Sequence, residues 1–461
     1  MANRKLTVAV CGGGLAGVTA AIALSRLSSE KKDIHIDIYE SAQEFTEIGA
    51  GIGMFLRPWK IMKHLGIDRP LRKIAKVPET ENQPILTFEF RKSDQTKGVT
   101  FYNLAIPFGF LSYHRAALLQ CLVEQIDPQS TTIHFSKRLV SFELPSDDHK
   151  ATPIRLSFKD GTNAECDVLI GADGIHSSVR HIMFDLAAQN AQTCGSEDSE
   201  TIAASLRDRK RPVWSGSVVY RGLISIEGLK KINPNHRVID TSQNYVGKSK
   251  HIIAIPIEKK DVINVAAFCS WPEKEGTPLE GKISGEASQK EVLEQFAGWE
   301  DEAQQILQCL HNPTKWSICT VKELTTSVYD RVALVGDAAH AMTPHQGSGA
   351  GQAFEDVYIL AALLAHPLTT VETVHVALKV YETVRLPHAN FVMRQSRRNG
   401  LLYEFNSPEF SSIDTEIESP EQLSDLGPTI IKGWEWAWKT DVEDDKLLAI
   451  NLFEEHLKNG I

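Results

Sequence analysis

The chain has 461 residues, of which 42% are hydrophobic and 23% charged, enough for two or three ordinary domains and without a sign of extended disorder. The 49 basic and 59 acidic residues give a net charge of −10, which disfavours a general nucleic-acid or anionic-membrane surface but permits a local cationic pocket for a small anion. The seven cysteines form no C-x-x-C pair and no apolar stretch reaches the roughly 20 residues of a membrane span, so we expect a cytoplasmic protein without disulfides or a zinc site.

The chain begins with a predicted β-α-β unit. A short apolar run predicts a strand over 6–11, a glycine-rich turn covers 12–17, and apolar residues at helical spacing predict a helix over 18–27. A second strand is predicted over 35–39 and is followed by Glu40. This order is typical of a nucleotide-binding unit at the start of an α/β domain.

The glycine-rich turn reads Gly-Gly-Gly-Leu-Ala-Gly and fits the pattern G-x-G-x-x-G at Gly12, Gly14 and Gly17. The first glycine permits a sharp turn, the second lets the backbone approach a pyrophosphate at the helix N-terminus, and the third lets helix and strand pack closely. Glu40 stands where a carboxylate can hold ribose hydroxyls. The unit therefore predicts a dinucleotide site, without deciding between FAD and NAD.

Helix and strand patterns alternate along the rest of the chain. Strands are predicted in three further regions, which are residues 84–103, 132–158 and 214–271. One helix is predicted between the glycine-rich stretch that ends at Gly53 and Leu65, and a second over 114–126. Further helices, with breaks, are predicted from 351 to 405. Two polar segments without apolar periodicity predict a long loop over 186–211 and a linker over 411–428.

Two further motifs place a carboxylate and a glycine at the end of a buried strand. Asp173-Gly174 follows the apolar run 167–170, and Gly336-Asp337 follows the run 332–335. Parallel α/β sheets bind ligands at the carboxyl ends of their strands. Either pair alone is more simply explained as an ordinary turn. Because both follow the glycine-rich turn in order along the chain, together they favour one composite nucleotide site.

These motifs resemble those of the group A flavoprotein aromatic hydroxylases, in particular salicylate hydroxylase. The most specific stretch is the run from Gly336-Asp-Ala-Ala-His to Gln-Ala-Phe-Glu-Asp356, and the resemblance extends over nearly the whole chain. It implies an α/β fold with a Rossmann-like FAD-binding domain, interleaved with a β-sheet substrate domain and followed by C-terminal helices. The expected segments are 1–80, 108–186 and 327–400 for FAD, 81–107 and 187–326 for the substrate, and 401–461 for the C-terminal helices.

The resemblance implies a set of residues that bind FAD. Those expected at the pyrophosphate and ribose are Gly12, Gly14, Leu15, Ala16, Gly17 and Glu40. Those expected at the phosphates, the ribityl chain or the reducing coenzyme are Arg115, Asp173, Gly174, Gly336 and Asp337. Those expected under the isoalloxazine, where backbone N–H groups at a helix N-terminus can stabilise a reduced anionic flavin, are Pro344, Gly347, Gly349 and Ala350.

Two residues are implied to act on the substrate. Arg221 lies in a strand-like segment, where the residues alone fit an exposed strand arginine equally well; the resemblance places it in the pocket, holding a carboxylate or phenolate. His251 alone is better explained as a core histidine, and the resemblance makes it face the substrate. His340 and His345 could be read as metal ligands, but the surrounding glycines and the missing further ligands speak against a metal site. Trp434, Trp436 and Trp438 are expected to pack the C-terminal helices.

Three positions depart from the salicylate hydroxylase pattern. Leu56-Arg57 replaces the usual Pro-Asn, Ile255 precedes a proline where some relatives have Tyr, and Ala117 replaces an aspartate. The first two are expected to border the active site. They leave the cofactor assignment intact and the exact substrate open, with Arg57 as a second candidate for a substrate contact.

The implied activity is hydroxylation of a small phenolic acid with FAD, O2 and NADH or NADPH. Attack at the carbon that bears the carboxylate would release CO2, giving catechol from salicylate or hydroquinone from 4-hydroxybenzoate. Two alternatives remain open: a non-decarboxylating or dearomatising phenol hydroxylase of the same fold, and a nucleotide-binding redox sensor without oxygen chemistry. No nucleic-acid or membrane partner is expected, and the protein is expected to be a monomer or homodimer.

Overall fold

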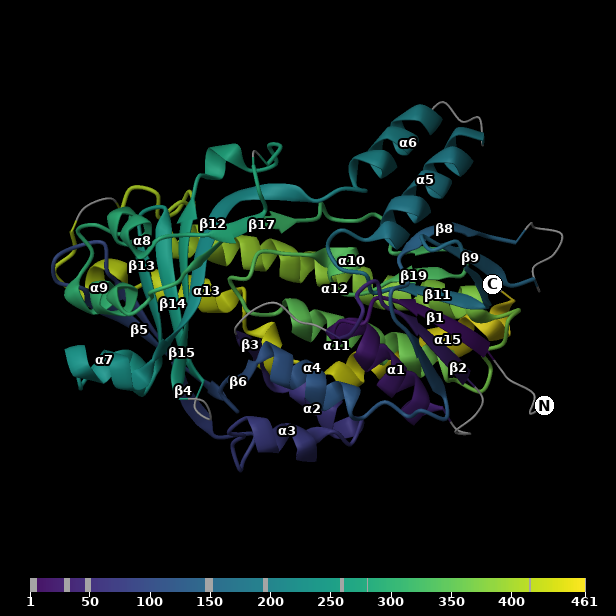
Figure 1. The fold of residues 1–461 in the computed structure, drawn as a ribbon, viewed down its shortest axis with the longest axis horizontal. Coiled ribbons are helices and arrows are strands. Elements are labelled where there is room, and N and C mark those ends of the chain that lie inside the picture. Colours follow the sequence, from purple (N-terminus) through teal and green to yellow (C-terminus); the bar gives the residue numbers. More distant parts are fainter. Residues whose placement is uncertain are drawn as a thin grey trace.

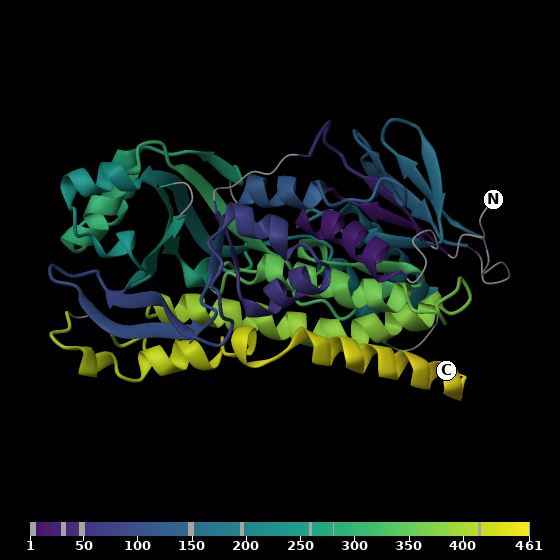
Figure 2. The same ribbon diagram turned by 90° about the horizontal axis from the view of Figure 1, so that it is seen from below.

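The fold is seen in a computed structural model, which describes residues 6–28, 34–45, 51–145, 152–193, 198–257, 261–279, 281–413 and 416–460. Two large sheets lie at opposite ends of an elongated molecule (Figure 1), and long helices run along one side of it (Figure 2). Among the helices within these residues, none is long and apolar enough to cross a lipid bilayer.

The six-stranded sheet carries the predicted nucleotide motifs. Its strand order is β18 (Val328–Tyr329), β19 (Val332–Leu334), β11 (Val168–Gly171), β1 (Leu6–Cys11), β2 (Ile34–Tyr39) and β7 (Thr131–His134). All neighbours pair in parallel except β18 and β19. β1, β11 and β19 are almost entirely buried, as expected for a parallel sheet that is covered on both faces.

Helices complete this half of the molecule. The first glycine-rich turn leads into α1 (Leu15–Leu27), which packs against α11 (Gly349–Leu364) in the main hydrophobic core. The long α12 (Val374–Tyr403) and α15 (Val442–Asn459) lie side by side along the bottom of the molecule (Figure 2). The shorter helices here are α2 (Leu56–His64), α3 (Asp68–Ile74), α4 (Arg115–Val123) and α10 (Asp337–His340).

The eight-stranded sheet is mainly antiparallel. Its order is β16 (Ser284–Glu286), β17 (Thr314–Thr320), β12 (Val213–Ser225), β15 (Val262–Ser270), β14 (Lys250–Ile257), β13 (Ser242–Gly247), β4 (Pro84–Lys92) and β5 (Val99–Pro107). Its second core is formed with α7 (Ile226–Ile232), α8 (Gln289–Gln295) and α9 (Asp301–Gln308). All its strands come from residues 84–107 and 213–320, so this sheet is inserted twice into the chain that builds the first one.

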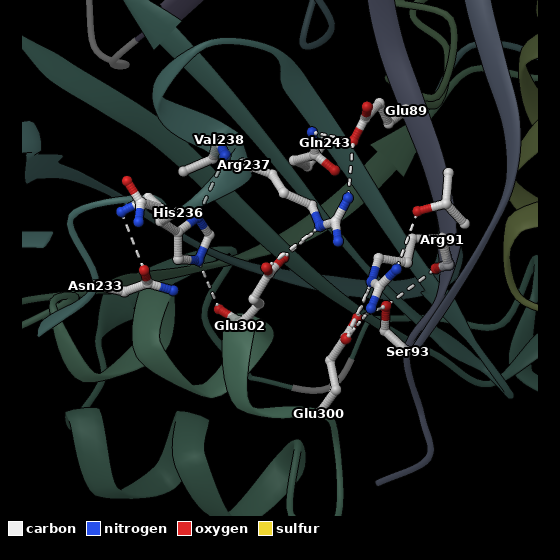
Figure 3. A network of polar contacts seen from close by, with 12 residues as sticks. Glu89, Arg91, Ser93, Asn233, His236, Arg237, Val238, Gln243, Glu300 and Glu302 are labelled. Carbon is white, nitrogen blue, oxygen red and sulfur yellow. Dashed lines mark hydrogen bonds and ion pairs between the residues drawn. The ribbon is translucent and has the colours of Figure 1, made fainter. Parts of the chain in front are cut away.

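A polar network joins β4 of the eight-stranded sheet and the 3₁₀ turn Arg237–Ile239 to the start of α9 (Figure 3). The guanidinium of Arg91 on β4 donates to the Glu300 carboxylate at 2.8 Å, and Arg237 donates to Glu302 at 3.0 Å. Nε2 of His236 lies 3.0 Å from the carbonyl oxygen of Glu302. These contacts join β4 to a helix more than 200 positions away, which fixes the inserted hairpin β4–β5 on the sheet.

The predicted loop over 186–211 is wrong. Residues 178–193 form α5 (Ser178–Thr193) and residues 199–208 form α6 (Ser199–Asp208), two packed helices that project at the upper right of Figure 1. Within residues 186–208, the described apolar residues that are buried are Ala188 and Ala203, which are small, so no stripe of large apolar residues marked this stretch as helical. The domain boundary expected at residue 186 lies inside α5. The predicted linker over 411–428 likewise contains a 3₁₀ turn, Pro420–Leu423, and the start of α13 (Leu426–Lys432).

The remaining elements are short. A two-stranded sheet pairs β3 (Gly51–Met54) with β6 (Leu111–His114), and a three-stranded sheet joins β8 (Leu139–Glu143), β9 (Ile154–Phe158) and β10 (Asn163–Cys166). Two further 3₁₀ turns cover Arg237–Ile239 and Pro272–Lys274, and α14 covers Trp436–Lys439.

Candidate active site

The glycine-rich turn has the close geometry that its motif predicts. Gly12 has φ of 108°, and a Cβ atom there would lie 2.3 Å from the carbonyl oxygen of Ala172. A Cβ atom on Gly17 would lie 1.9 Å from the carbonyl oxygen of Gly12. The backbone N–H of Gly13 donates to the Glu40 carboxylate at 2.6 Å, so this acid braces the turn from the end of β2. Larger side chains at Gly12 or Gly17 would push the strand, the turn and α1 apart.

A cavity of about 380 Å³ lies between this turn and the eight-stranded sheet. Ten of the predicted cofactor residues line it together, although they come from five separate parts of the chain: Gly14, Leu15, Ala16, Arg115, Gly174, Asp337, Pro344, Gly347, Gly349 and Ala350. Gly51 and Gly53 of β3 also border it. The cavity is thus enclosed on one side by glycine-rich backbone, which a flat or phosphate-bearing cofactor can approach closely.

The facing wall is one face of the eight-stranded sheet. Val219 and Arg221 on β12 pair with Phe268 and Ala266 on β15, so their side chains share this face. Ile253 on β14 continues the row. Burial and the nearby charge of Arg115 both lower the pKa of Arg221. Arg221 thus presents a guanidinium from a mostly apolar wall, a setting that favours an anionic ligand.

His251 differs from its expected place. It is fully buried, and it is not among the residues that line the cavity. Its ring stacks on Phe268, with 4.3 Å between ring centroids and an interplanar angle of 5°, and Phe268 does line the cavity. The Phe268 ring therefore lies between His251 and the cavity, so His251 does not contact a ligand in the cavity directly.

Five of the predicted cofactor residues do not line the cavity: Gly12, Gly17, Glu40, Asp173 and Gly336. The Asp173 carboxylate accepts hydrogen bonds from the backbone N–H of Ser178 at 2.7 Å and of Val179 at 3.1 Å, which caps the N-terminus of α5. Gly336 has φ of 58°, and a Cβ atom there would lie 3.0 Å from the Cβ of Ala353. Gly336 therefore serves the packing of the strand end against α11.

Arg180 joins the two strand-end motifs, a role that sequence reasoning did not assign. Its guanidinium donates to the carbonyl oxygens of Ile175, beside the Asp173-Gly174 pair, and of Ala338, in α10, the latter at 2.8 Å. Burial lowers the pKa of Arg180 to about 10, which still leaves it charged at neutral pH. The available signal in the sequence was the position of Arg180 close after the Asp173-Gly174 pair. A fully buried arginine needs nearby groups that accept its hydrogen bonds.

The hypothesis that Arg57 contacts the substrate is wrong. Its side chain is 2% exposed, points to an ion pair with Glu355 of α11, and is absent from the cavity lining. Glu355 also pairs with Arg385 at 3.0 Å, and Arg385 pairs with Asp356 at 3.0 Å. Asp356 in turn accepts the backbone N–H of Gly336 at 2.9 Å. This buried network joins α2, α11 and α12 to the Gly336-Asp337 motif. The sequence did not reveal the role of Glu355 and Asp356, although these two residues end the stretch from Gly336 to Asp356 that carries the resemblance.

The two histidines of that stretch have protein partners. His340 is paired with Asp356, and His345 packs between His251 and Tyr403. Among the described residues, no three His, Cys, Asp or Glu side chains gather in a way that could hold a metal ion.

An aromatic cluster supports the cavity from behind. Phe110 lines the cavity, and its ring packs so closely on Gly53 that a Cβ atom there would lie 1.7 Å from it. Phe55 joins Phe110 to Trp434, with ring centroids 4.8 Å and 5.4 Å away, and Trp438 packs on Trp434 at 6.1 Å. The C-terminal tryptophans therefore pack as predicted, in a place that holds the cavity wall.

A second, larger cavity of about 860 Å³ lies next to the first. Neighbouring residues of the same segments border the two cavities: Gly174 and Ile318 line the first, and His176 and Cys319 line the second. The basic side chains along it are Arg138, His176, Arg180, His181, Lys210 and Arg211. None of its lining residues that the structure describes is acidic, although the chain as a whole carries a net charge of −10.

Comparison with known proteins agrees with the site. The family model described as FAD binding domain matches residues 5–396. The chain is 33% identical over 449 residues to salicylate hydroxylase of Pseudomonas putida, covering 95% of this chain and 93% of that protein. It is also 33% identical to an FAD-dependent monooxygenase of Strobilurus tenacellus, covering 99% of both chains. A solved salicylate hydroxylase substrate complex matches with a TM-score of 0.77 and 28% identity, covering 96% of this chain and 98% of that one.

The glycines that line the cavity, among them Gly14, Gly53 and Gly347, form a glycine cradle. They carry no side chain between the backbone and the cavity, which fits the close approach of FAD. The family model identifies the dinucleotide as FAD rather than NAD. The similarity to the two monooxygenases covers 95% and 99% of this chain, which favours an enzyme over a redox sensor without oxygen chemistry. The chain belongs to the FAD-binding-domain family and is a flavin-dependent aromatic monooxygenase of the group A, salicylate hydroxylase type.

Proposed function

We propose that this enzyme hydroxylates a phenolic acid of the hydroxybenzoate type, using O2 and NADH or NADPH, and that the attack releases CO2. The observation that carries the proposal is the position of Arg221, a cation on a mainly apolar wall that faces the glycine cradle across the cavity. Two relatives support it by name, the salicylate hydroxylase of Pseudomonas putida and a 6-methylsalicylate 1-monooxygenase of Aspergillus terreus, which is 29% identical.

FAD would be held by the turn at Gly14, by Arg115 and Asp337, and by the loop that begins at Pro344. When bound and reduced, it supplies the activation of O2 and the transfer of an OH group to an electron-rich ring carbon. Gly347 and Ser348 lead directly into α11, which begins at Gly349, and the first backbone N–H groups of this helix would form a positive end for the reduced, anionic ring.

The wall would orient and desolvate the substrate. Arg221 would hold the carboxylate or phenolate by charge-assisted hydrogen bonds, while Ile253, Ala266 and Phe268 pack on the ring and exclude water. A phenolate is far more reactive than a phenol toward an electrophilic OH group, and an unperturbed phenol has a pKa of about 10. A guanidinium beside the oxygen favours the ionised form at neutral pH.

The second cavity would receive the reducing coenzyme. Its size, its basic side chains and its border with the first cavity suit a dinucleotide that carries negative phosphates. Trp214 is also part of its lining and offers an apolar surface for a base. The coenzyme would thus approach from the side of α5 and leave the eight-stranded wall free for the aromatic acid.

The test is a coenzyme-consumption screen of the FAD-loaded enzyme over hydroxybenzoates, with CO2 and aromatic products measured. We expect salicylate or a substituted salicylate to stimulate NADH or NADPH consumption and to give one catechol and one CO2 per turnover. A hydroxylated product that keeps its carboxylate, or a dearomatised one, would establish the alternative hydroxylase instead. Stimulation by none of the phenolic acids would overturn the proposal.

A further inference from the structure

The sheet wall of the cavity carries a second polar side chain besides Arg221. Asn264 on β15 lines the cavity and is 8% exposed. It lies two positions before Ala266, the cross-strand partner of Arg221, and therefore on the same face of the sheet. The other described residues of this sheet that line the cavity are apolar: Val219, Ile253, Ile255, Ala266, Phe268 and Ile318. Within the described part of the chain, the wall thus offers a ligand two polar side chains, one cation and one amide.

The Asn264 amide is buried without a partner. Among the residues that the structure describes, its Oδ1 atom has no hydrogen-bond partner. Its neighbours in the sheet supply none, because Asn264 pairs with Leu223 on β12 and with Ile255 on β14, and both of these side chains are apolar. An unpaired buried amide destabilises a protein, so such groups are nearly always hydrogen-bonded. An amide that lines a cavity can be satisfied by the molecule that binds there.

Gly51 leaves room for this amide. A Cβ atom on Gly51 would lie 2.9 Å from Nδ2 of Asn264 and 3.0 Å from its Cγ. Gly51 belongs to β3 and lines the cavity as part of the glycine cradle. Asn264 therefore stands at the corner where the sheet wall meets the cofactor side, and a larger residue at position 51 would displace its amide.

The two wall groups match the two substituents of a phenolic acid. A guanidinium suits a carboxylate, because it carries the opposite charge and can donate two parallel hydrogen bonds. An amide suits a phenolic oxygen in either ionisation state: Nδ2 donates to a phenolate, and after a half-turn of the amide Oδ1 accepts from a hydroxyl. Diagonal neighbours on adjacent strands lie about 7–8 Å apart. The long arginine side chain shortens this gap, so one aromatic ring can reach both groups.

We propose that Asn264 is a specificity-determining residue that binds the phenolic oxygen of the substrate, while Arg221 binds its carboxylate. The pair selects aromatic acids that carry a ring hydroxyl. It disfavours benzoates without one, because a ligand that cannot bond the amide leaves it buried and unpaired. The inference rests on the proposed function, because it requires a phenolic acid in the cavity.

The test measures ligand binding to the oxidised, FAD-loaded enzyme without reducing coenzyme. Salicylate, 4-hydroxybenzoate and benzoate are titrated, and the change in flavin absorbance gives a Kd for each. Benzoate keeps the ring and the carboxylate but lacks the hydroxyl. The Kd of benzoate divided by that of the tighter hydroxybenzoate therefore measures recognition of the phenolic oxygen. In the wild type we expect this ratio to be about 10 to 100.

Three variants separate the two wall groups. Asn264→Leu keeps the size of the side chain but removes both hydrogen-bonding ends, so the ratio should fall to about 1 while FAD content stays normal. Arg221→Ala should weaken all three ligands by a similar factor and keep the ratio, because they share the carboxylate. Asn244→Leu is the matched control and should keep the wild-type ratio. Asn244 is buried on β13 of the same sheet, its Oδ1 also lacks a partner among the described residues, and it does not line the cavity.

Asn264→Ala repeats the measurement if Asn264→Leu does not fold, and the ratio should again fall to about 1. An unchanged ratio in a folded Asn264 variant, or an equal fall in Asn244→Leu, would overturn the role of Asn264. Loss of FAD with the ratio intact would also overturn it, because the amide would then serve the cofactor. So would a wild-type enzyme that binds benzoate as tightly as both hydroxybenzoates. A wild-type enzyme that binds none of the three acids would overturn the proposed function itself.

Discussion

Arg57 and Glu355 form a two-point ion pair inside the protein, with Nε–Oε1 and Nη2–Oε2 distances of 3.0 Å and 2.8 Å. Arg57 belongs to α2 and also donates to Asp445 of α15 at 2.6 Å, while Glu355 belongs to α11 and also accepts from Arg385 of α12. The Glu355 carboxylate thus joins three helices, α2, α11 and α12, and Arg57 links them to α15 through Asp445.

Removing this carboxylate should destabilise the protein strongly. Glu355→Gln leaves two buried guanidinium groups without their shared partner, so we expect the free energy of unfolding to fall by about 3–5 kcal/mol. Glu294→Gln is the control, since its pair with Lys290 is 3.7 Å long and both side chains are mostly exposed, and it should cost less than about 1 kcal/mol. Urea unfolding followed by tryptophan fluorescence measures both. Equal losses in the two variants would contradict the structural role of the network.

The same carboxylate should make stability depend on acid pH. Burial alone would raise the pKa of Glu355, but Arg57 and Arg385 lower it to about 2, below its ordinary 4.5. A lowered folded-state pKa contributes stability above about pH 4.5 that is lost as the pH falls toward about 2. The stability difference between wild type and Glu355→Gln should therefore be constant above pH 5 and shrink by about 1.4 kcal/mol per pH unit below 4.5. A difference that stays constant down to pH 3 would show that the fold does not lower the pKa of Glu355.

Arg221 should set the affinity for the aromatic acid. Arg221→Ala removes the cation on the sheet wall, and charge-assisted hydrogen bonds are worth roughly 1.5–3 kcal/mol each, so KM for the phenolic acid should rise about 10- to 100-fold. FAD content should stay normal. Arg155→Ala on β9, a 62% exposed arginine, is the control and should leave KM unchanged. Steady-state kinetics and the flavin absorbance of the purified proteins decide the point; a wild-type KM in Arg221→Ala would place the substrate elsewhere.

The tight packing of the first turn should be essential for retaining FAD. Gly17→Ala introduces a Cβ atom that would lie 1.9 Å from the Gly12 carbonyl oxygen, which forces α1 away from the pyrophosphate site. We expect protein purified without most of its yellow flavin. Gly285→Ala on β16, where a Cβ atom meets nothing within 4 Å, should retain a full complement. Flavin-to-protein absorbance ratios compare the two, and full retention in Gly17→Ala would contradict this site.

Charge reversal in the larger cavity should weaken the reducing coenzyme selectively. Arg211→Glu and Arg138→Glu each replace an exposed cation of the cavity. We expect KM for NADH or NADPH to rise about tenfold at low salt, with less effect at high ionic strength and an unchanged KM for the aromatic acid. Arg155→Glu carries the same charge change on β9, at a side chain that does not line the cavity. If it raises the coenzyme KM as much as the cavity variants do, the effect is one of net charge and the cavity is not the coenzyme site.

The local sequence determined much of the FAD half. The glycine-rich turn, Glu40 and the run from Gly336 to Asp356 were recognisable because each function requires fixed residue types at short spacing. The structure brings Gly14, Arg115, Asp337 and Pro344 to one cavity, as one composite site predicts. The apolar strands of the parallel sheet were also recognisable, because burial on both faces leaves a continuous apolar run.

Only the tertiary structure decided the rest. In the stretch 186–208 of α5 and α6, the described buried apolar residues are the small Ala188 and Ala203, so this stretch leaves little periodic signal. Arg57 looked like a substrate contact until it met Glu355, 298 positions away. His251 was likewise expected at the substrate, but Phe268 lies in front of it and Glu404 behind it. A charged or titratable side chain takes its role from the groups that desolvate and pair with it, and these come from distant segments that no local pattern brings together.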